Sequence, residues 1–283
     1  MFVDKVLGVK NKPKNSGFSL TEMLLAIGIL SVGMVFIAGV FPVAIHFMTV
    51  STERTIAAVV ADEAFAKIKL YAHPDPAGPD TNEINLTALP IAGHAYFRDK
   101  RIFPVMAYID PNEEFTYPST DTDISQKHYC FSALCRLTAP NSRLVQVTVF
   151  INRKTGPILR YYAPNILPDP GTAGYGVVDF SKAVDWPRPV KVAVDVATRS
   201  NELRIDYTNA KEKTFFNDGC RIVDNAAGRI YRVMERYAPP NDNLVLLDGD
   251  WQGGPHGYVW VVPPPVNGGR YPCIAVYQKE IRF

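Results

Sequence analysis

The stretch Lys14-Asn15-Ser16-Gly17-Phe18-Ser19-Leu20-Thr21-Glu22 stands directly before an apolar run from Met23 to Met48. That run contains no lysine, arginine, aspartate or glutamate, and it exceeds the roughly 20 residues that a helix needs to cross a bilayer core. Glu22 is the anomaly at its start, because a carboxylate that enters lipid costs about 2.5–3.5 kcal/mol on insertion scales. Acids in such positions usually mark a function.

This junction resembles the N-terminal signature of type IV pilins and of the pseudopilins of type II secretion. Gly17, Phe18 and Glu22 have the spacing of that signature, with lysines before them and an apolar helix after them. The resemblance covers about residues 10–70. It implies that a prepilin peptidase cuts after Gly17, that the new N-terminus at Phe18 is methylated, and that Glu22 assists filament assembly with other subunits and an assembly platform.

The charges fit that interpretation. A freed amino group on Phe18 would be a cation at the membrane edge, and Glu22 lies about one helical turn further along the chain. The two charges could pair within one subunit or between neighbours. Pairing would remove the cost of carrying an unpaired acid among apolar helices.

Two plainer interpretations compete with this one. Ser19-x-x-Glu22 also matches a helix capping box, with which an ordinary membrane anchor could begin. A secretory signal peptide that is cut later is the second, but the apolar run is too long for it and no clear small-x-small cleavage site follows. The pilin-type interpretation is therefore favoured over a plain anchor.

The composition bounds the rest of the protein. The chain has 283 residues and a formal net charge of +2, so it can form one large or two small β-rich modules beside the helix, and nothing indicates nucleic-acid binding. By the positive-inside rule, the leader (residues 1–17) stays in the cytoplasm. We therefore expect a single-pass membrane protein with an exported head. The resemblance to pilins implies that the membrane is the inner one and that the protein later enters a periplasmic or cell-surface filament. The leader's basic residues are Lys5, Lys10, Lys12 and Lys14.

Export would place the cysteines Cys130, Cys135, Cys220 and Cys273 in an oxidising compartment, where three pairings are possible. We favour a disulfide between Cys220 and Cys273. Cys130 and Cys135 have an odd separation, so on one regular strand they would face opposite sides. No metal site is expected, because no Cys-x-x-Cys pair is present.

The periodicity predicts an α+β fold. One long helix is expected over residues 18–72, with its membrane part at about 20–48 and a kink at Pro42. The alternative is a separate short helix after a break at Pro42. Its outer part carries one apolar face at helical spacing: Ala57, Val60, Ala61, Ala64, Phe65 and Ile68. This face should pack on an antiparallel β-sheet, which is the arrangement of pilins.

We expect a loop-rich connection at residues 73–127, the sheet at 128–207 and a small all-β module, a barrel or sandwich, at 208–283. Strands are predicted at 128–138 and 143–152, with Val145, Val147, Val149 and Ile151 facing the helix, and a third at 158–162. Residues 163–187 look like a connector, and a further strand pair follows at 190–196 and 202–207. The C-terminal module should contain strands at 220–223, 229–236, 243–248, 258–262 and 273–282.

No catalytic motif is present: the sequence has no Gly-x-Ser-x-Gly and no phosphate-binding loop. We therefore expect no enzymatic activity and no cofactor. Acidic clusters at Asp121–Asp123 and Asp242–Asp250 could offer oxygen ligands to Ca²⁺ but lack a complete loop, so solvated turns are the favoured interpretation. Trp260 is expected in the core, whereas Trp251, in a glycine-rich turn, is expected at the surface.

These features favour a pilin-like subunit, minor because its head is large, in a type IV pilus or a type II secretion pseudopilus. The alternative is a plain membrane-anchored protein that binds a polysaccharide or a protein through its C-terminal β module. The sequence leaves open the choice between pilus and secretion machinery.

Overall fold

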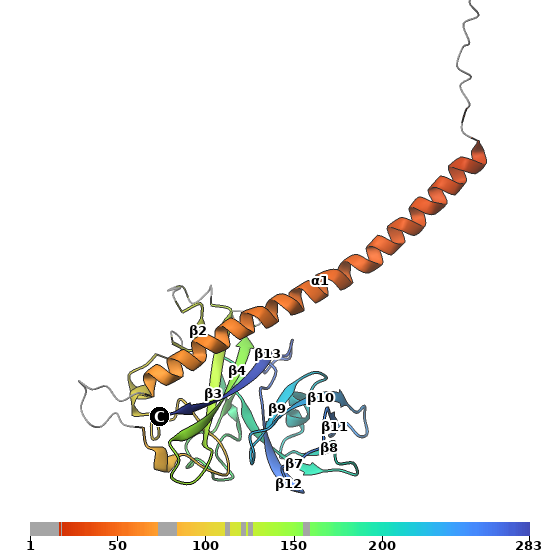
Figure 1. Ribbon diagram of the computed structural model, residues 1–283. Helices are drawn as coiled ribbons and strands as arrows, with labels where there is room; N and C mark the ends of the chain where they lie inside the picture. Colours follow the sequence, from red (N-terminus) through yellow and green to blue (C-terminus); the bar gives the residue numbers. More distant parts are fainter. Residues whose placement is uncertain are drawn as a thin grey trace, which may run out of the picture. The chain divides into compact units, whose positions relative to one another are not determined.

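The computed structural model describes residues 17, 19–72, 84–110, 114–119, 123, 127–154 and 159–283. The chain divides into two units, residues 1–52 and residues 53–283, which are described separately below. Helix α1 (Leu20–Tyr71) contributes to both units. The second unit, called the head from here on, contains the last part of α1 and all the strands, so the fold is α+β (Figure 1).

Helix α1 is a single element of 52 residues, or roughly 80 Å at 1.5 Å per residue. Pro42 lies inside it and does not end it, so the alternative of a separate helix after a break at Pro42 is not found. Proline removes only one backbone hydrogen bond. Leu, Met, Ala and other apolar residues on both sides maintain the helix.

A five-stranded sheet forms the part of the head next to the helix. Its long strands are β3 (Tyr129–Leu137), β4 (Leu144–Arg153) and β13 (Cys273–Arg282), all antiparallel to their neighbours. The short strands β1 (Ala95–Tyr96) and β2 (Thr116–Tyr117) both pair with β3. The turn between β3 and β4 contains Asn141 at a φ of 56°, a conformation that asparagine tolerates better than most residues.

The helix covers one face of this sheet. Along β4, Val145, Val147, Val149 and Ile151 are fully buried in the same cluster as the helix face at Ala57, Val60, Ala61, Ala64 and Ile68. This is the packing expected from the alternation of β4 and the helical spacing of the apolar residues. Phe65 is only partly buried at the edge of the cluster.

The neighbour of β4 differs from the expected one. We expected the segment after β4 to form the third strand of the sheet, but β5 (Tyr161–Pro164) pairs with β6 (Val178–Val184) in a separate ribbon. The edge of β4 is taken by β13, whose register runs from Cys273 opposite Asn152 to Arg282 opposite Leu144. A four-residue strand cannot match the ten-residue β13 in hydrogen bonds and buried side chains along β4.

Six strands form a closed barrel in the order β10-β11-β8-β7-β12-β9. The strands at 190–196 and 202–206, which we had placed with the helix-covered sheet, belong to the barrel, whereas β13 belongs to that sheet. The sheets therefore divide the chain differently from the ranges 128–207 and 208–283. The barrel strands are β7 (Val190–Val196), β8 (Glu202–Asp206), β9 (Arg221–Asp224), β10 (Ile230–Arg236), β11 (Leu244–Leu247) and β12 (His256–Val261).

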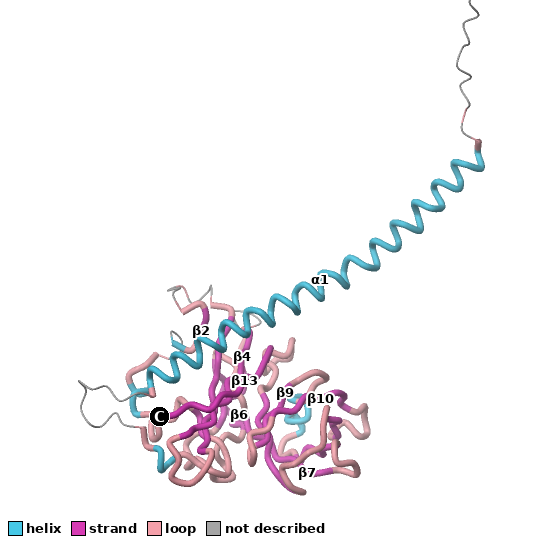
Figure 2. The backbone as a smooth tube through the Cα atoms, viewed as in Figure 1, coloured by secondary structure: helices cyan, strands magenta, loops and turns pink. Residues whose placement is uncertain are grey.

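The barrel and the sheet share buried side chains. Trp260 of β12 is fully buried in the cluster that also holds the helix face and β4, and its indole N–H donates to Asn225 Oδ1 over 2.8 Å. Gly176 makes room for the ring, because a Cβ there would lie 2.2 Å from an indole carbon. Figure 2 shows the barrel strands beside the sheet formed by β4 and β13.

The remaining described elements are short 3₁₀ helices. They are η2 (Leu86–Ala88), η3 (Pro104–Ala107) and η5 (Ala210–Phe215). The first two lie, with β1 and β2, in the region that the sequence indicated as loop-rich. Residues 73–83 of that region lie outside the described residues.

Candidate processing and assembly site

The helix begins with a reciprocal capping box at Ser19 and Glu22. The Glu22 backbone N–H donates to Ser19 Oγ over 3.2 Å, and the Ser19 backbone N–H donates to Glu22 Oε2 over 2.9 Å. These bonds satisfy two of the N–H groups that a helix start leaves without partners. Ser19 and Glu22 therefore fix the first turn of α1.

The capping bond also orients the carboxylate of Glu22. Because this side chain bonds the amide of Ser19, it points back along the chain toward the start of the helix. Gly17 is exposed, and Phe18 lies outside the described residues. The partly positive start of the helix favours a negative side chain at this position.

In the described residues, the capping bond uses only one carboxylate oxygen of Glu22. The bond reaches Oε2, and neither a hydrogen bond nor an ion pair to Oε1 is found there. A carboxylate can accept several hydrogen bonds. Oε1 is thus available to a cation from outside the described part of this chain.

The helix surface beyond Glu22 is apolar and uncovered. Leu20, Leu25, Val35 and Phe47 are exposed by 80, 66, 74 and 68 %, and the most apolar stretch of 18 residues has a mean hydropathy of 2.6 with none of it buried. This helix is long and apolar enough to cross a membrane. The surface is of the kind that lipid or other helices cover.

The hydroxyl groups on this surface bond within the helix. Ser31 Oγ donates to Ile27 O over 2.7 Å, and Thr49 and Thr52 make the same bond to the carbonyl four residues earlier. An intrahelical bond of this kind satisfies a polar group without water. These bonds therefore make the hydroxyl groups of Ser31, Thr49 and Thr52 compatible with an apolar environment.

The four cysteines are free thiols in the structure, so the expected Cys220–Cys273 bridge is not formed in it. Burial raises the pKa of Cys220 to about 12, although a hydrogen bond with Tyr271 acts in the opposite direction. Burial also raises the pKa of Cys273, and the nearby Cys220 raises it further. A protonated thiol reacts slowly in disulfide exchange. The bridge remains a prediction for the oxidised protein.

Two other predicted candidates lie where they have structural partners. Trp251 was expected at the surface but is only 8 % exposed: its ring packs 5.3 Å from that of Tyr231, and its N–H donates to Gly254 O. Asp242 pairs with Lys213 and lies near Arg236, while Asp250 accepts a hydrogen bond from Ser200. Among the described residues, no group of three or more His, Cys, Asp or Glu side chains could hold a metal ion. Asp121 lies outside them.

Comparison with known proteins identifies the junction but not the head. Residues 12–38 match the prokaryotic N-terminal methylation motif. No curated protein and no solved structure matches the chain. The matched residues include Gly17, Phe18 and Glu22, together with the capping box and the first uncovered turns of α1. The protein therefore carries the N-terminal signature of type IV pilins and pseudopilins at residues 12–38.

Proposed function

We propose that this protein is a pilin-like subunit, minor rather than major, of a type IV pilus or a type II secretion pseudopilus. It would be cut after Gly17 by a prepilin peptidase, methylated on Phe18 and drawn from the inner membrane into a filament through α1. Its role would be structural rather than enzymatic. The observation that carries the proposal is the methylation motif at residues 12–38, located at the start of an uncovered membrane-length helix.

Glu22 would select a neighbour by charge. Cleavage after Gly17 would leave an amino group on Phe18, next to the residue whose amide Glu22 already binds. A carboxylate that caps its own helix through Oε2 can accept the amine of a neighbouring subunit through Oε1. In an apolar bundle an ion pair of this kind would remove the cost of two unpaired charges.

The apolar surface would supply contact area between subunits, but it would do little to fix the position of one helix along its neighbour. Lipid tails are as apolar as leucine, so burying such side chains against another helix gains little over leaving them in lipid. A charge pair at a fixed position is different, because a shift by one turn leaves both charges unpaired. Glu22 would therefore set how far one subunit is displaced along its neighbour.

The head supports a pilin-like arrangement, with the outer part of α1 packed on an antiparallel sheet. The six-stranded barrel is additional material, and bulky heads are harder to repeat around a filament. This favours a minor subunit. The positive-inside rule favours a leader in the cytoplasm and a head outside the inner membrane.

The capping box is the observation that favours the second candidate, a binding protein on a plain anchor. A cap alone would explain Ser19 and Glu22 without any assembly role. Mass spectrometry of the mature protein separates the two candidates. The pilin-like subunit should begin at N-methylated Phe18, whereas a plain anchor should retain Met1.

Two matched variants separate the cap from the charge of Glu22. Glu22→Gln keeps a side-chain acceptor at the capping position but removes the negative charge. Ser19→Ala removes the hydroxyl cap, at a cost of about 1 kcal/mol, and keeps the charge. Both variants are produced in cells that make the native filament, and the protein is quantified in sheared filaments and in the membrane fraction.

We expect Glu22→Gln to reach the membrane in normal amounts and to be lost from filaments, and Ser19→Ala to be incorporated. Incorporation of Glu22→Gln at the wild-type level would contradict the charge-based assembly. Loss of Ser19→Ala alone would show that the cap, and not the charge, is required.

A further inference from the structure

The C-terminal half of β13 is an uncovered edge of the helix-covered sheet. β13 pairs with β4 along one side, and in the described part of the chain no strand pairs with its other side. The backbone N–H of Phe283 donates to Arg143 O over 3.0 Å. Because hydrogen-bonded and non-hydrogen-bonded positions alternate in antiparallel pairs, the backbone N–H and C=O groups of residues 278, 280 and 282 point away from β4.

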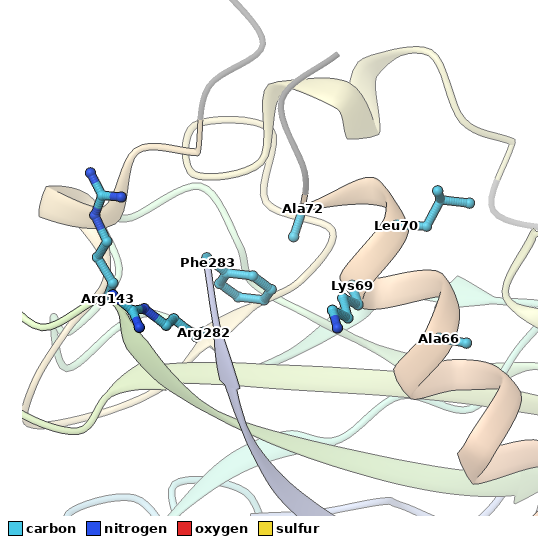
Figure 3. Close-up of a pocket in the computed structure, with 7 residues that line it drawn as sticks. All are labelled: Ala66, Lys69, Leu70, Ala72, Arg143, Arg282 and Phe283. Atoms are coloured by element: carbon cyan, nitrogen blue, oxygen red, sulfur yellow. The ribbon is translucent and has the colours of Figure 1, made fainter. Parts of the chain in front are cut away.

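A groove follows this edge where α1 passes beside it. One cavity of about 650 Å³ lies between the last turns of the helix, at Ala66 and Leu70, and the strand ends at Arg143 and Phe283. Figure 3 shows the Phe283 ring directed toward the helix turn that carries Lys69. A second cavity of about 320 Å³ continues toward Asp62 and Lys279. The two share Ala66, Lys69 and Arg282, so they form one helix-edge groove.

The helix-edge groove is positively charged and partly apolar. Lys69, Lys279, Arg143 and Arg282 line it, and none of the ion pairs found among the described residues includes these four cations. Asp62 and Glu280 are the acids in its lining, so the cations outnumber them. Leu70 is exposed by 68 % beside the cations. A ligand that fits must therefore be both acidic and apolar.

We propose that the helix-edge groove binds an extended acidic segment of a partner protein, which pairs with β13 as an additional strand. The outward backbone groups of residues 278, 280 and 282 would supply main-chain hydrogen bonds, which give affinity in this mode of recognition. Lys69, Arg143 and Arg282 would bind the segment's carboxylates. The apolar side chains of the segment would cover Leu70 and Phe283. This interaction does not depend on cleavage or methylation at Gly17 and Phe18.

A second copy of β13 fits this edge less well. A second β13 would bring its own Lys279 and Arg282 close to the four cations of the groove, and these like charges would repel one another. An acidic segment of another sequence is the better complement.

The test uses the full-length protein in detergent micelles and a fluorescent peptide that alternates valine with glutamate over about eight residues, enough to span the exposed half of β13. Such a peptide presents one apolar and one acidic face in either register. Binding is followed by fluorescence anisotropy at low and high salt. A peptide that alternates valine with lysine is the charge control.

Glu280→Pro and Glu280→Ala are the decisive pair of variants. Both remove the same carboxylate, but only proline removes an N–H that points away from β4, and proline is tolerated on an edge strand. We expect Glu280→Pro to bind the peptide about tenfold or more weakly than Glu280→Ala. Thermal unfolding of both variants checks that the head is intact.

Arg282→Gln tests the charge of the groove, and Lys182→Gln, at an exposed side chain of β6, is its control. We expect Arg282→Gln to weaken binding several-fold and to reduce its salt dependence, with Lys182→Gln unchanged. Equal binding by the two Glu280 variants, equal binding of the lysine peptide, or no binding at millimolar peptide would each overturn the proposal.

Discussion

Residues 20–48 and residues 57–68 of α1 are both rich in apolar side chains, but these differ in size and distribution. In the first stretch large side chains such as Leu25, Val35 and Phe47 cover the whole circumference and stay exposed. In the second, a narrow face that includes three alanines is buried against the sheet. Small residues allow a helix to lie close to a sheet, and large ones all round require partners on every side.

This difference identifies what stabilises each part of the helix. The outer stretch is held by its own chain, so substitutions there should act on the folding of the head. The first stretch is covered by nothing in its own unit, so substitutions there should act on membrane insertion and assembly. Matched substitutions in the two stretches can test this distinction.

The largest effect is expected from shortening the same side chain in the two stretches. Ile68 is fully buried and Ile37 is 65 % exposed. We expect Ile68→Ala to lower the free energy of unfolding of the head by about 2–5 kcal/mol, because it leaves a cavity against the sheet. Ile37→Ala should leave it unchanged. Chemical denaturation of the full chain in micelles, followed by tryptophan fluorescence, measures both. A comparable loss in Ile37→Ala would show that residues 20–48 also stabilise the folded head.

The second effect concerns the start of the head's part of α1. Glu53 forms ion pairs with Arg153 and, at 3.3 Å, with Arg270, and its side chain is only 13 % exposed. Glu53→Ala should destabilise the head by about 1.5–3 kcal/mol, since it leaves Arg153 partly buried without its carboxylate. The neighbouring Arg54 is exposed, so Arg54→Ala is the control and should cost little. A shift of the thermal midpoint in Arg54→Ala equal to that in Glu53→Ala would contradict this role.

The third effect is a pH dependence that only the head should show. Burial, and then the charge of Arg136, lowers the pKa of His94 from 6.5 to about 3. Between these values the unfolded chain binds a proton at this residue and the folded chain does not. The free energy of unfolding should therefore fall as the pH drops from 6.5 toward 3, by up to about 1.4 kcal/mol per pH unit, and be insensitive to His94 above 6.5.

Substitution isolates this contribution from that of the carboxylates. His94→Gln should flatten the dependence of stability on pH below 6.5. Denaturation curves at several pH values measure the slopes. An unaltered slope in His94→Gln would show that this histidine is not buried in its neutral form.

The positions of the strands could be predicted from the sequence much better than their partners. The strands at 190–196 and 273–282 have the predicted bounds, because alternation of side chains is a local property. Which strands pair is decided by contacts between segments far apart in the chain. β5 was assigned to the wrong neighbour because the competing strand, β13, lies more than a hundred residues later.

The candidate site was easier to predict than the core of the barrel. Ser19, Glu22 and the apolar run lie close together in the sequence, and the capping box follows from their spacing. Trp251 was misjudged because its burial depends on a turn folding over the ring. A Cβ at Gly253 would lie 2.3 Å from a ring carbon of Trp251, so the glycine allows the backbone to pack against the ring. In the sequence alone, a glycine-rich stretch indicates only a flexible turn.

The smallest effect is expected from the polar face of the head's helix. Lys67 lies 3.1 Å from Glu63 and 3.6 Å from Glu114, and it donates to the Glu114 carbonyl. Lys67→Met should lower the free energy of unfolding by about 0.5–1 kcal/mol, since partly exposed pairs contribute little. The share of this loss that comes from the ion pairs should shrink in about 1 M salt, where the Debye length is about 3 Å. Lys69→Met, which removes a cation outside these ion pairs, is the control. A loss of several kcal/mol in Lys67→Met would mean that charge, and not the buried alanine face, holds this half of α1 to the sheet.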